Sequence, residues 1–174
     1  RIQTLGESKN SALHFLFEYI TIKARNKFFE YFLYFTDYNN DKSVIDIGTT
    51  PSLDLEDNFF LHKVKKNQNI TCFSNQDCSN LSNNFPNIKK FIIGDARYSN
   101  LKNNFFDIVH SNATIEHVGS FENQIKFTKE LVRISKKFVF IQTPNRFYPI
   151  DFHTLLPFIH WLPRNVHRKI LQFL

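Results

Sequence analysis

The chain has 174 residues, 42% of them hydrophobic, and a formal net charge of +6. This length predicts a single domain with a substantial core, and no apolar run is long enough to span a bilayer. The lysines are scattered rather than gathered in a stripe with interleaved aromatic residues, which favours a solvated basic surface and argues against a nucleic-acid partner.

Cysteine usage and the two ends of the chain give further expectations. Cys72 and Cys78 lack the spacing of a metal-binding pair, and no signal peptide is recognisable, so we expect a reduced, cytoplasmic setting. The chain begins at Arg1 and contains no Met, which predicts that the native amino terminus is missing. An apolar helical pattern runs to Leu174 without a stop signal, so we expect a fragment.

The first half of the chain predicts alternating helices and strands. A helix is expected over residues 11–35, followed by a strand over 44–47, a helix over 55–66, a strand over 69–73 and a short helix over 77–84. Apolar residues recur at steps of three and four along the first helix, which predicts a core-facing stripe. The members of this stripe are Leu13, Leu16, Phe17, Ile20, Ala24, Phe28, Phe32 and Phe35.

The second half continues the same alternation. Strands are expected over 91–93, 105–110 and 138–141, with a helix over 120–135 that Ser120 caps. We expect that helix to bury a face made of Phe121, Ile125, Leu131 and Val132. Strands alternating with helices at this spacing predict βαβ units and a mostly parallel sheet, that is, a Rossmann-like three-layer α/β/α sandwich. We expect one domain over 1–174, with an N-terminal helix at 11–35, a core at 43–145 and a lid or helical segment at 146–174.

Polar or turn-forming residues follow every predicted strand. They are Asp46-Ile47-Gly48, Ser74-Asn75, Gly94-Asp95-Ala96, Ser111-Asn112 and Gln142-Thr143-Pro144-Asn145. The carboxyl ends of parallel strands converge on one crevice, where open α/β sheets bind ligands. Loops are polar in any case, but this does not account for the repeated pairing of an acid with a glycine. Gly48 has no side chain, so the backbone there can turn tightly and approach a ligand.

Three blocks resemble the class I S-adenosylmethionine-dependent methyltransferases, small-molecule branch, and the later segment 143–150, with His153 and residues 155–163, is similar to a bacterial type-11-like subgroup. The three blocks are Val44-Ile45-Asp46-Ile47-Gly48, Gly94-Asp95-Ala96 and the run from Phe106 to Val118 that contains Glu116-His117. The resemblance covers residues 43 to about 150 and implies methyl transfer from S-adenosylmethionine to a small-molecule acceptor, with S-adenosylhomocysteine as the product. It also implies two further strands that close the sheet, and nothing after Ile150 predicts a strand.

The resemblance implies a role for each matching position. Gly48, Thr49 and Thr50 would lie beside the amino-acid part of the cofactor, and Asp46 would order that turn. Asp95 would accept a hydrogen bond from the adenine amino group, with Ala96 beside the ring. Ser111 and Asn112 would line the floor near the methionine end.

Two positions depart from the family pattern. The loop after the first strand reads Thr49-Thr50-Pro51-Ser52, where the family has further glycines. The acid that holds the ribose hydroxyls is replaced by Ser74, with Asn75 beside it, and Asp77 can substitute only if its loop folds back. These departures keep open an alternative, a non-catalytic nucleotide-binding or scaffolding domain. A nicotinamide-dependent oxidoreductase is disfavoured, because it needs a glycine-rich loop that opens a helix.

Histidines and the C-terminal segment give the remaining candidates. His117 can serve as a general base, although methyl transfer needs little beyond in-line positioning. His153, His160 and His167 recur every seventh residue, but prolines interrupt that stretch and few acidic residues lie nearby in the sequence, so we expect no metal site.

Residues 155–174 are apolar and basic; we favour packing of this segment on the domain over contact with a membrane surface. The oligomeric state stays open.

Overall fold

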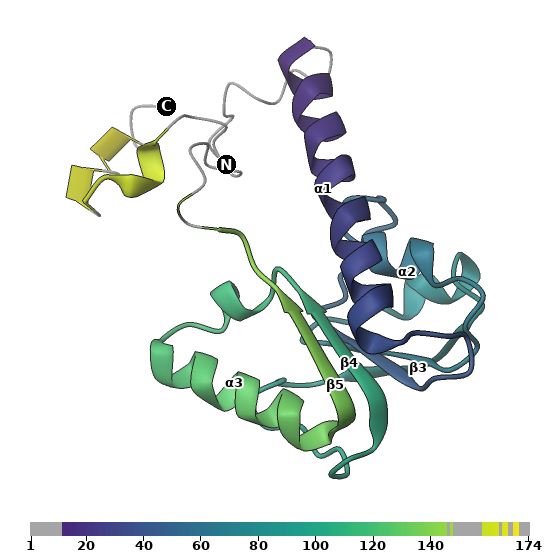
Figure 1. Ribbon diagram of the computed structural model, residues 1–174. Coiled ribbons are helices and arrows are strands. Elements are labelled where there is room, and N and C mark those ends of the chain that lie inside the picture. The colour runs from purple at the N-terminus through teal and green to yellow at the C-terminus, as the bar shows by residue number, and fades with distance from the viewer. Residues whose placement is uncertain (1–11, 146, 148–157, 164, 167–168, 171–174) are drawn as a thin grey trace. The chain divides into compact units, whose positions relative to one another are not determined.

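The computed structural model describes residues 12–145, 147, 158–163, 165–166 and 169–170 (Figure 1). The chain divides into two units, one made of residues 25–143 and the other of the described residues outside that range. In the second unit the chain forms the amino-terminal half of helix α1 and a 3-10 helix, η3, at Ile159–Trp161. His153 and His167 lie outside the described residues. The candidate site lies entirely within residues 25–143.

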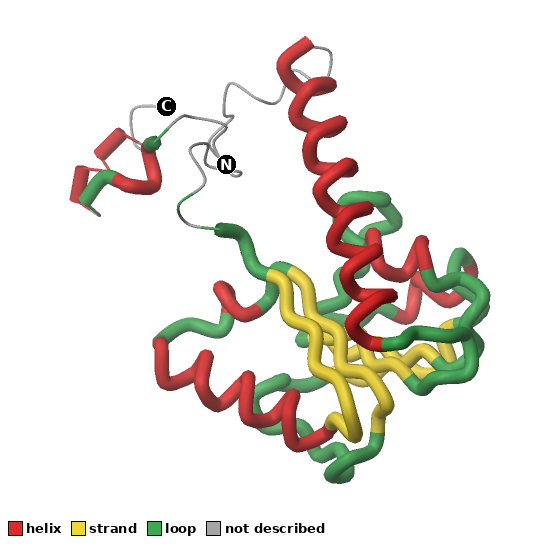
Figure 2. The backbone as a smooth tube through the Cα atoms, in the orientation of Figure 1, coloured by secondary structure: helices red, strands yellow, loops and turns green. Residues whose placement is uncertain are grey.

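A five-stranded parallel sheet forms the centre of the larger unit (Figure 2). Its strands are β1 Val44–Ile47, β2 Ile70–Ser74, β3 Ile88–Ile93, β4 Phe106–Asn112 and β5 Ser135–Gln142. They lie in the order β3-β2-β1-β4-β5, and every neighbouring pair is parallel. The predicted Rossmann-like α/β class is therefore confirmed. The order reverses between β1 and β4, and ligands bind at such a switch point in open α/β sheets.

Strand β1 is buried on both faces, which explains its run of apolar β-branched residues. Val44 belongs to a core cluster that also contains residues of α1 and α2, whereas Ile45 and Ile47 belong to a cluster with α3. Helices thus cover both faces of the sheet, α3 on one side and α1 with α2 on the other (Figure 1). The alternation of side chains along β1 sends successive residues to opposite layers.

Helix α1 spans Ala12–Thr36, but most of the stripe predicted for it is wrong where side chains are described. Ile20, Phe28 and Phe35 are exposed, whereas Phe29, Phe32 and Thr36 face the sheet. Phe32 is in edge-to-face contact with both Phe60 and Phe140. Because aromatic residues occur on every side of this helix, the three-four spacing fits more than one face, and only the sheet selects among them.

The remaining helices are shorter or rotated relative to the predictions. Helix α2 covers only Phe59–Lys63 rather than 55–66, because the residues before it form the long turn after β1. A 3-10 helix, η1 at Ser79–Asn83, stands where the short helix was predicted. Helix α3 spans Phe121–Ile134, and Ser120 caps it by accepting a hydrogen bond from the Asn123 amide at 3.3 Å.

The buried face of α3 also differs from the prediction. Phe127, Leu131 and Ile134 are buried, whereas Phe121, Ile125 and Val132 are exposed. The buried residues are spaced by four and three, so the helical period is correct and the phase is wrong.

Asp107 ties together the amino-terminal ends of three strands. Its Oδ2 accepts hydrogen bonds from the Ser43 amide at 2.8 Å and the Ser43 hydroxyl at 2.6 Å, and Lys136 Nζ lies 3.0 Å from Oδ1. Burial of Asp107 opposes ionisation, but the bonds from Ser43 and Lys136 outweigh it and lower its pKa to about 2. The carboxylate therefore stabilises the fold above its unfolded-state pKa, and this contribution is lost as the pH falls toward 2.

Replacing Asp107 with Asn is expected to lower the free energy of unfolding at pH 7, on the order of 1 kcal/mol because solvent screens the partly exposed carboxylate. The difference from the wild type should shrink between pH 4 and pH 2, as the wild-type carboxylate is protonated. Urea unfolding at several pH values measures it, with exposed Asp41→Asn as the control. A deficit that stays the same from pH 7 to pH 2 would contradict the assignment.

Candidate functional site

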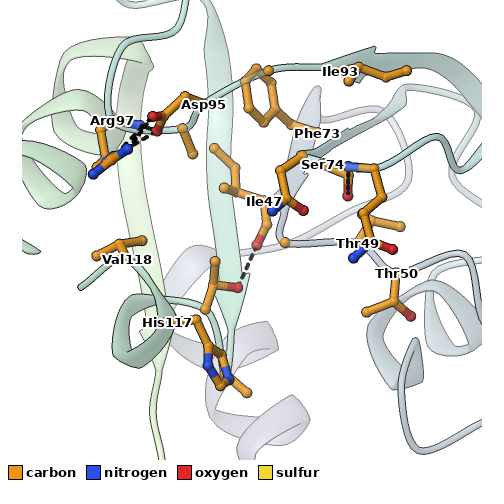
Figure 3. A pocket seen from close by; sticks show the side chains of 17 residues that line it. Ile47, Thr49, Thr50, Phe73, Ser74, Ile93, Asp95, Arg97, His117 and Val118 are labelled. Atoms are coloured by element: carbon orange, nitrogen blue, oxygen red, sulfur yellow. Dashed lines mark hydrogen bonds and ion pairs between the residues drawn. The ribbon is translucent and has the colours of Figure 1, made fainter. Parts of the chain in front are cut away.

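A cavity of about 560 Å³ opens at the carboxyl edge of the sheet (Figure 3). Residues from the ends of β1, β2, β3 and β4 line it. Eight of the eleven site residues predicted from sequence are among them: Gly48, Thr49, Thr50, Ser74, Asn75, Asp95, Ala96 and His117. The cavity is within the usual size range of small-molecule sites. We call it the strand-end cavity.

Three predicted residues do not line this cavity. Asp46 is buried beneath the turn after β1, where it accepts hydrogen bonds from His110 Nδ1 at 2.6 Å and from the Thr49 hydroxyl at 2.9 Å. Ser111 is also buried, and its hydroxyl donates to the Ile47 carbonyl at 2.9 Å. Asn112 lines a separate, smaller cavity. Asp46 and Ser111 thus hold the backbone that shapes the strand-end cavity.

Gly48 meets two independent constraints at the end of β1. Its φ is +97°, and an added Cβ would lie 1.9 Å from Thr114 Oγ1. The Thr114 hydroxyl lies 3.2 Å from the Ile47 carbonyl and 3.0 Å from the Asn112 carbonyl, so it is held where a side chain at position 48 would have to go. Sequence reasoning missed Thr114, because only the tertiary structure brings it against Gly48.

Replacing Gly48 with Ala is expected to destabilise the fold more than replacing Gly119 with Ala. Both glycines have φ near +98°, so both substitutions incur the strain of a positive φ, of about 1–2 kcal/mol. At Gly119 the nearest atom to an added Cβ is Asn123 Nδ2 at 3.3 Å, so the steric overlap is specific to Gly48.

Urea unfolding of the two variants separates the effects. We expect Gly48→Ala to lose at least about 1 kcal/mol more than Gly119→Ala. Equal losses would show that Thr114 does not constrain position 48.

The turn after β1 is held by a side-chain amide instead of being built from glycines. Asn58, only 3% exposed, donates through Nδ2 to the Thr50 carbonyl at 2.9 Å and the Ser52 carbonyl at 2.6 Å. Its Oδ1 accepts from the Thr50 amide at 3.3 Å. Asn80 Nδ2 also donates to the Pro51 carbonyl at 2.7 Å. These bonds satisfy backbone groups that would otherwise be orphaned, which explains how a loop containing Pro51 keeps a defined shape.

Asn58→Asp is expected to lower the free energy of unfolding by about 1–3 kcal/mol, because the two donor bonds from Nδ2 are lost and a charge is buried. Differential scanning calorimetry and urea unfolding measure the loss. Exposed Asn83→Asp, with the same chemical change, is the control. If both variants unfold like the wild type, Asn58 does not hold the turn.

Asp95, which follows the end of β3, lines the strand-end cavity on the side away from the turn after β1. Its carboxylate forms a double hydrogen bond with Arg97, from Nε to Oδ1 at 2.9 Å and from Nη2 to Oδ2 at 2.5 Å (Figure 3). The bonds from Arg97 lower the pKa of Asp95 below its ordinary value. Arg97, which sequence reasoning missed, also lines the cavity. Asp95 is thus an ionised acceptor in a fixed orientation.

The end of β2 presents neutral side chains to the strand-end cavity. The Ser74 hydroxyl accepts a hydrogen bond from the Gln76 amide at 3.1 Å, and Asn75 and Gln76 lie beside it. Asp77 is exposed, accepts a bond from the Ser79 amide at 2.9 Å and does not line the cavity. Hydroxyl and amide groups therefore stand where the family pattern has a carboxylate.

The segment after β4 forms the last wall of the strand-end cavity. Ala113 has a φ of +50°, a strained backbone conformation for a residue with a Cβ. The 3-10 helix η2, Ile115–His117, then places the exposed His117 at the cavity (Figure 3). Glu116 instead accepts a bond from the Thr143 hydroxyl at 3.2 Å. Among the described residues, no three His, Cys, Asp or Glu side chains lie together as a metal site would require, and no helix has the length and apolarity to cross a membrane.

Comparison with known proteins gives a family match and a shared fold. Residues 63–140 match a family model described as a methyltransferase domain, and no curated protein matches the chain significantly. A S-adenosylmethionine-dependent methyltransferase from Aquifex aeolicus is 14% identical, with a TM-score of 0.52 over 88% of this chain and 77% of that one. The YcgJ protein from Bacillus subtilis is 14% identical, with a TM-score of 0.51 over 66% of this chain and 50% of that one.

A third similar structure is the PH0226 protein from Pyrococcus horikoshii OT3. It is 15% identical, with a TM-score of 0.52 over 75% of this chain and 54% of that one. The chain therefore spans about half the length of YcgJ and of PH0226. At these identities the structures establish a common fold, and the matched segment is similar to a methyltransferase domain. The chain thus shares its fold with these structures and contains a segment similar to a methyltransferase domain.

Proposed function

We propose that the chain binds S-adenosylmethionine in the strand-end cavity and transfers its methyl group to a small-molecule acceptor, releasing S-adenosylhomocysteine. One observation carries the proposal: the ends of four adjacent parallel strands, at the switch point of the sheet, supply the lining of one cavity. The donors and acceptors along this cavity fit an elongated ligand with a charged end, hydroxyl groups and an aromatic base.

Each part of the cofactor has a counterpart among the lining residues. Gly48, Thr49 and Thr50 lie at one end, suited to the amino-acid part, and Asp46 acts on that end indirectly through the Thr49 hydroxyl. Ser74 and Asn75 can hydrogen-bond the ribose hydroxyls. Asp95 can accept a bond from the adenine amino group while it remains paired with Arg97, because a carboxylate has about four lone-pair sites.

When bound, the cofactor supplies an electrophilic methyl group on a sulfonium. The task of this chain is then to hold the acceptor in line with that methyl group and to exclude water. A lone pair of the acceptor would form the new bond to that methyl group, the electron pair of the carbon–sulfur bond would remain on sulfur, and the acceptor would lose a proton. His117 can take this proton, because it is exposed at the edge of the strand-end cavity.

The fold does not provide what a nicotinamide cofactor requires. A pyrophosphate is bound at the amino terminus of a helix that opens directly after the first strand. Here eleven residues, 48–58, separate the end of β1 at Ile47 from α2, which begins at Phe59 and is only five residues long. A non-catalytic scaffolding domain uses the same cavity, so turnover alone separates it from an enzyme.

Titration of the protein with S-adenosylhomocysteine by calorimetry tests the proposal. We expect the wild type to bind, and Asp95→Ala to bind at least tenfold more weakly because the acceptor for the adenine amino group is lost. Asp77→Ala removes a nearby acid that does not line the cavity and should bind like the wild type. No binding at millimolar ligand would overturn the proposal. Binding without methyl transfer to any acceptor in a metabolite mixture would favour the scaffolding domain.

A further inference from the structure

A second, small cavity lies at the same edge of the sheet, on the face covered by α1 and α2. Its volume is about 20 Å³, enough for about one water molecule. Three long polar side chains line it, Arg25 from α1, Asn112 from the end of β4 and Gln142 from the end of β5. The rest of the wall is aromatic, formed by phenylalanines of α1 and α2 together with His110. We call it the Arg25 cavity.

The Arg25 cavity is separated from the strand-end cavity by the last rung of the β4–β5 ladder. Asn112 pairs with Gln142 in that ladder and lines the Arg25 cavity, whereas the next residue, Ala113, lines the strand-end cavity. The Ala113 amide donates to the Gln142 carbonyl at 3.0 Å. Consecutive Cα atoms are about 3.8 Å apart, so the two cavities adjoin on either side of this rung.

Arg25 is the charged residue among the side chains that line the small cavity. Its side chain is partly buried, and its Nη1 donates to the main-chain carbonyl of Glu56. None of the ion pairs among the described residues includes Arg25. Burial lowers the pKa of the guanidinium below its ordinary value, whereas the exposed carboxylates of Glu56 and Asp57 act in the opposite direction. The positive charge is thus only partly compensated.

We propose that the Arg25 cavity binds a carboxylate of the methyl acceptor, with Arg25 as the anchoring group. This inference rests on the proposed function, because it names the class of acceptor for the same site. A guanidinium matches the planar geometry of a carboxylate and forms two parallel hydrogen bonds with it. The amide groups of Asn112 and Gln142 provide further donors, and no acid lines the cavity among the described residues. Because the space holds about one water molecule, lining side chains must shift to admit a carboxylate, and a phosphate requires a larger shift.

The aromatic wall defines the rest of the acceptor. Phe29 and Phe32 of α1 and Phe59 and Phe60 of α2 line the Arg25 cavity, and Phe60 is in edge-to-face contact with Phe29 and Phe32. An apolar or aryl portion next to the carboxylate would contact these rings, and the reacting heteroatom would then extend past the β4–β5 rung toward the methyl group. The carboxylate replaces the Glu56 carbonyl as the hydrogen-bond acceptor of Arg25, so the Arg25 side chain shifts to admit it.

Matched pairs of small carboxylates and their amides test the proposal on protein saturated with S-adenosylhomocysteine. The probes are acetate with acetamide and benzoate with benzamide, titrated in a chloride buffer and followed by NMR and calorimetry. We expect each carboxylate to bind at least tenfold more tightly than its amide. Arg25→Gln should abolish this preference, whereas Lys27→Gln, which removes an exposed cation two residues away on α1, should keep it.

Three outcomes would overturn the proposal: no carboxylate binds, each carboxylate binds no better than its amide, or Arg25→Gln keeps the preference. Inorganic phosphate that binds more tightly than both carboxylates, again only with Arg25 present, would also overturn it in favour of a phosphorylated acceptor. If the wild type does not bind S-adenosylhomocysteine, that separate result contradicts the proposed function. The carboxylate preference is then measured on the free protein, so the two failures remain distinguishable.

Discussion

The carboxylate of Asp46 is the interaction on which both cavities depend. It is buried in the middle of the sheet, where His110 Nδ1 at 2.6 Å and the Thr49 hydroxyl at 2.9 Å are its partners. A buried carboxylate without partners is strongly unfavourable, so this arrangement fixes β1, β4 and the following turn relative to one another. Thr49 lines the strand-end cavity and His110 lines the Arg25 cavity, so one buried pair positions a wall of each.

Side chains replace glycine in shaping the turn after β1. Gly48 is the one position where the backbone conformation and the approach of Thr114 both exclude a side chain. Beyond it, Asn58 donates hydrogen bonds to the backbone carbonyls of Thr50 and Ser52, which holds a loop that contains no further glycine. The cost is that the Thr50 amide already has a partner in Asn58 and is less available to a ligand. Backbone satisfaction and ligand binding thus compete at this turn.

The sequence pattern did not identify which face of each helix is buried. The strands were predicted well, because a buried parallel strand requires a continuous apolar run and β1 has one. For α1 and α3 the period was correct, but among the described side chains only Phe32 and Leu131 of the predicted faces are buried. Phe28 and Phe29 are neighbours of identical chemistry, and only contact with Phe60 on the sheet face makes Phe29 the packing residue. When aromatic residues occur on every side of a helix, the sequence does not indicate which side is buried.

By itself the sequence determined the order of strands and helices, the parallel sheet and the set of polar strand ends, because these follow from local periodicity and from the geometry of parallel strands. Only the tertiary structure decided which of those residues share a cavity. It placed Asp46 and Ser111 beneath the backbone, Asn112 beside Arg25, and Thr114 and Arg97 at the strand-end cavity. Strand β4 ends at Asn112 and the backbone turns at Ala113, whose φ is +50°, so these neighbours in sequence line different cavities. Residues far apart in the sequence, such as Arg25 and Gln142, line the same one.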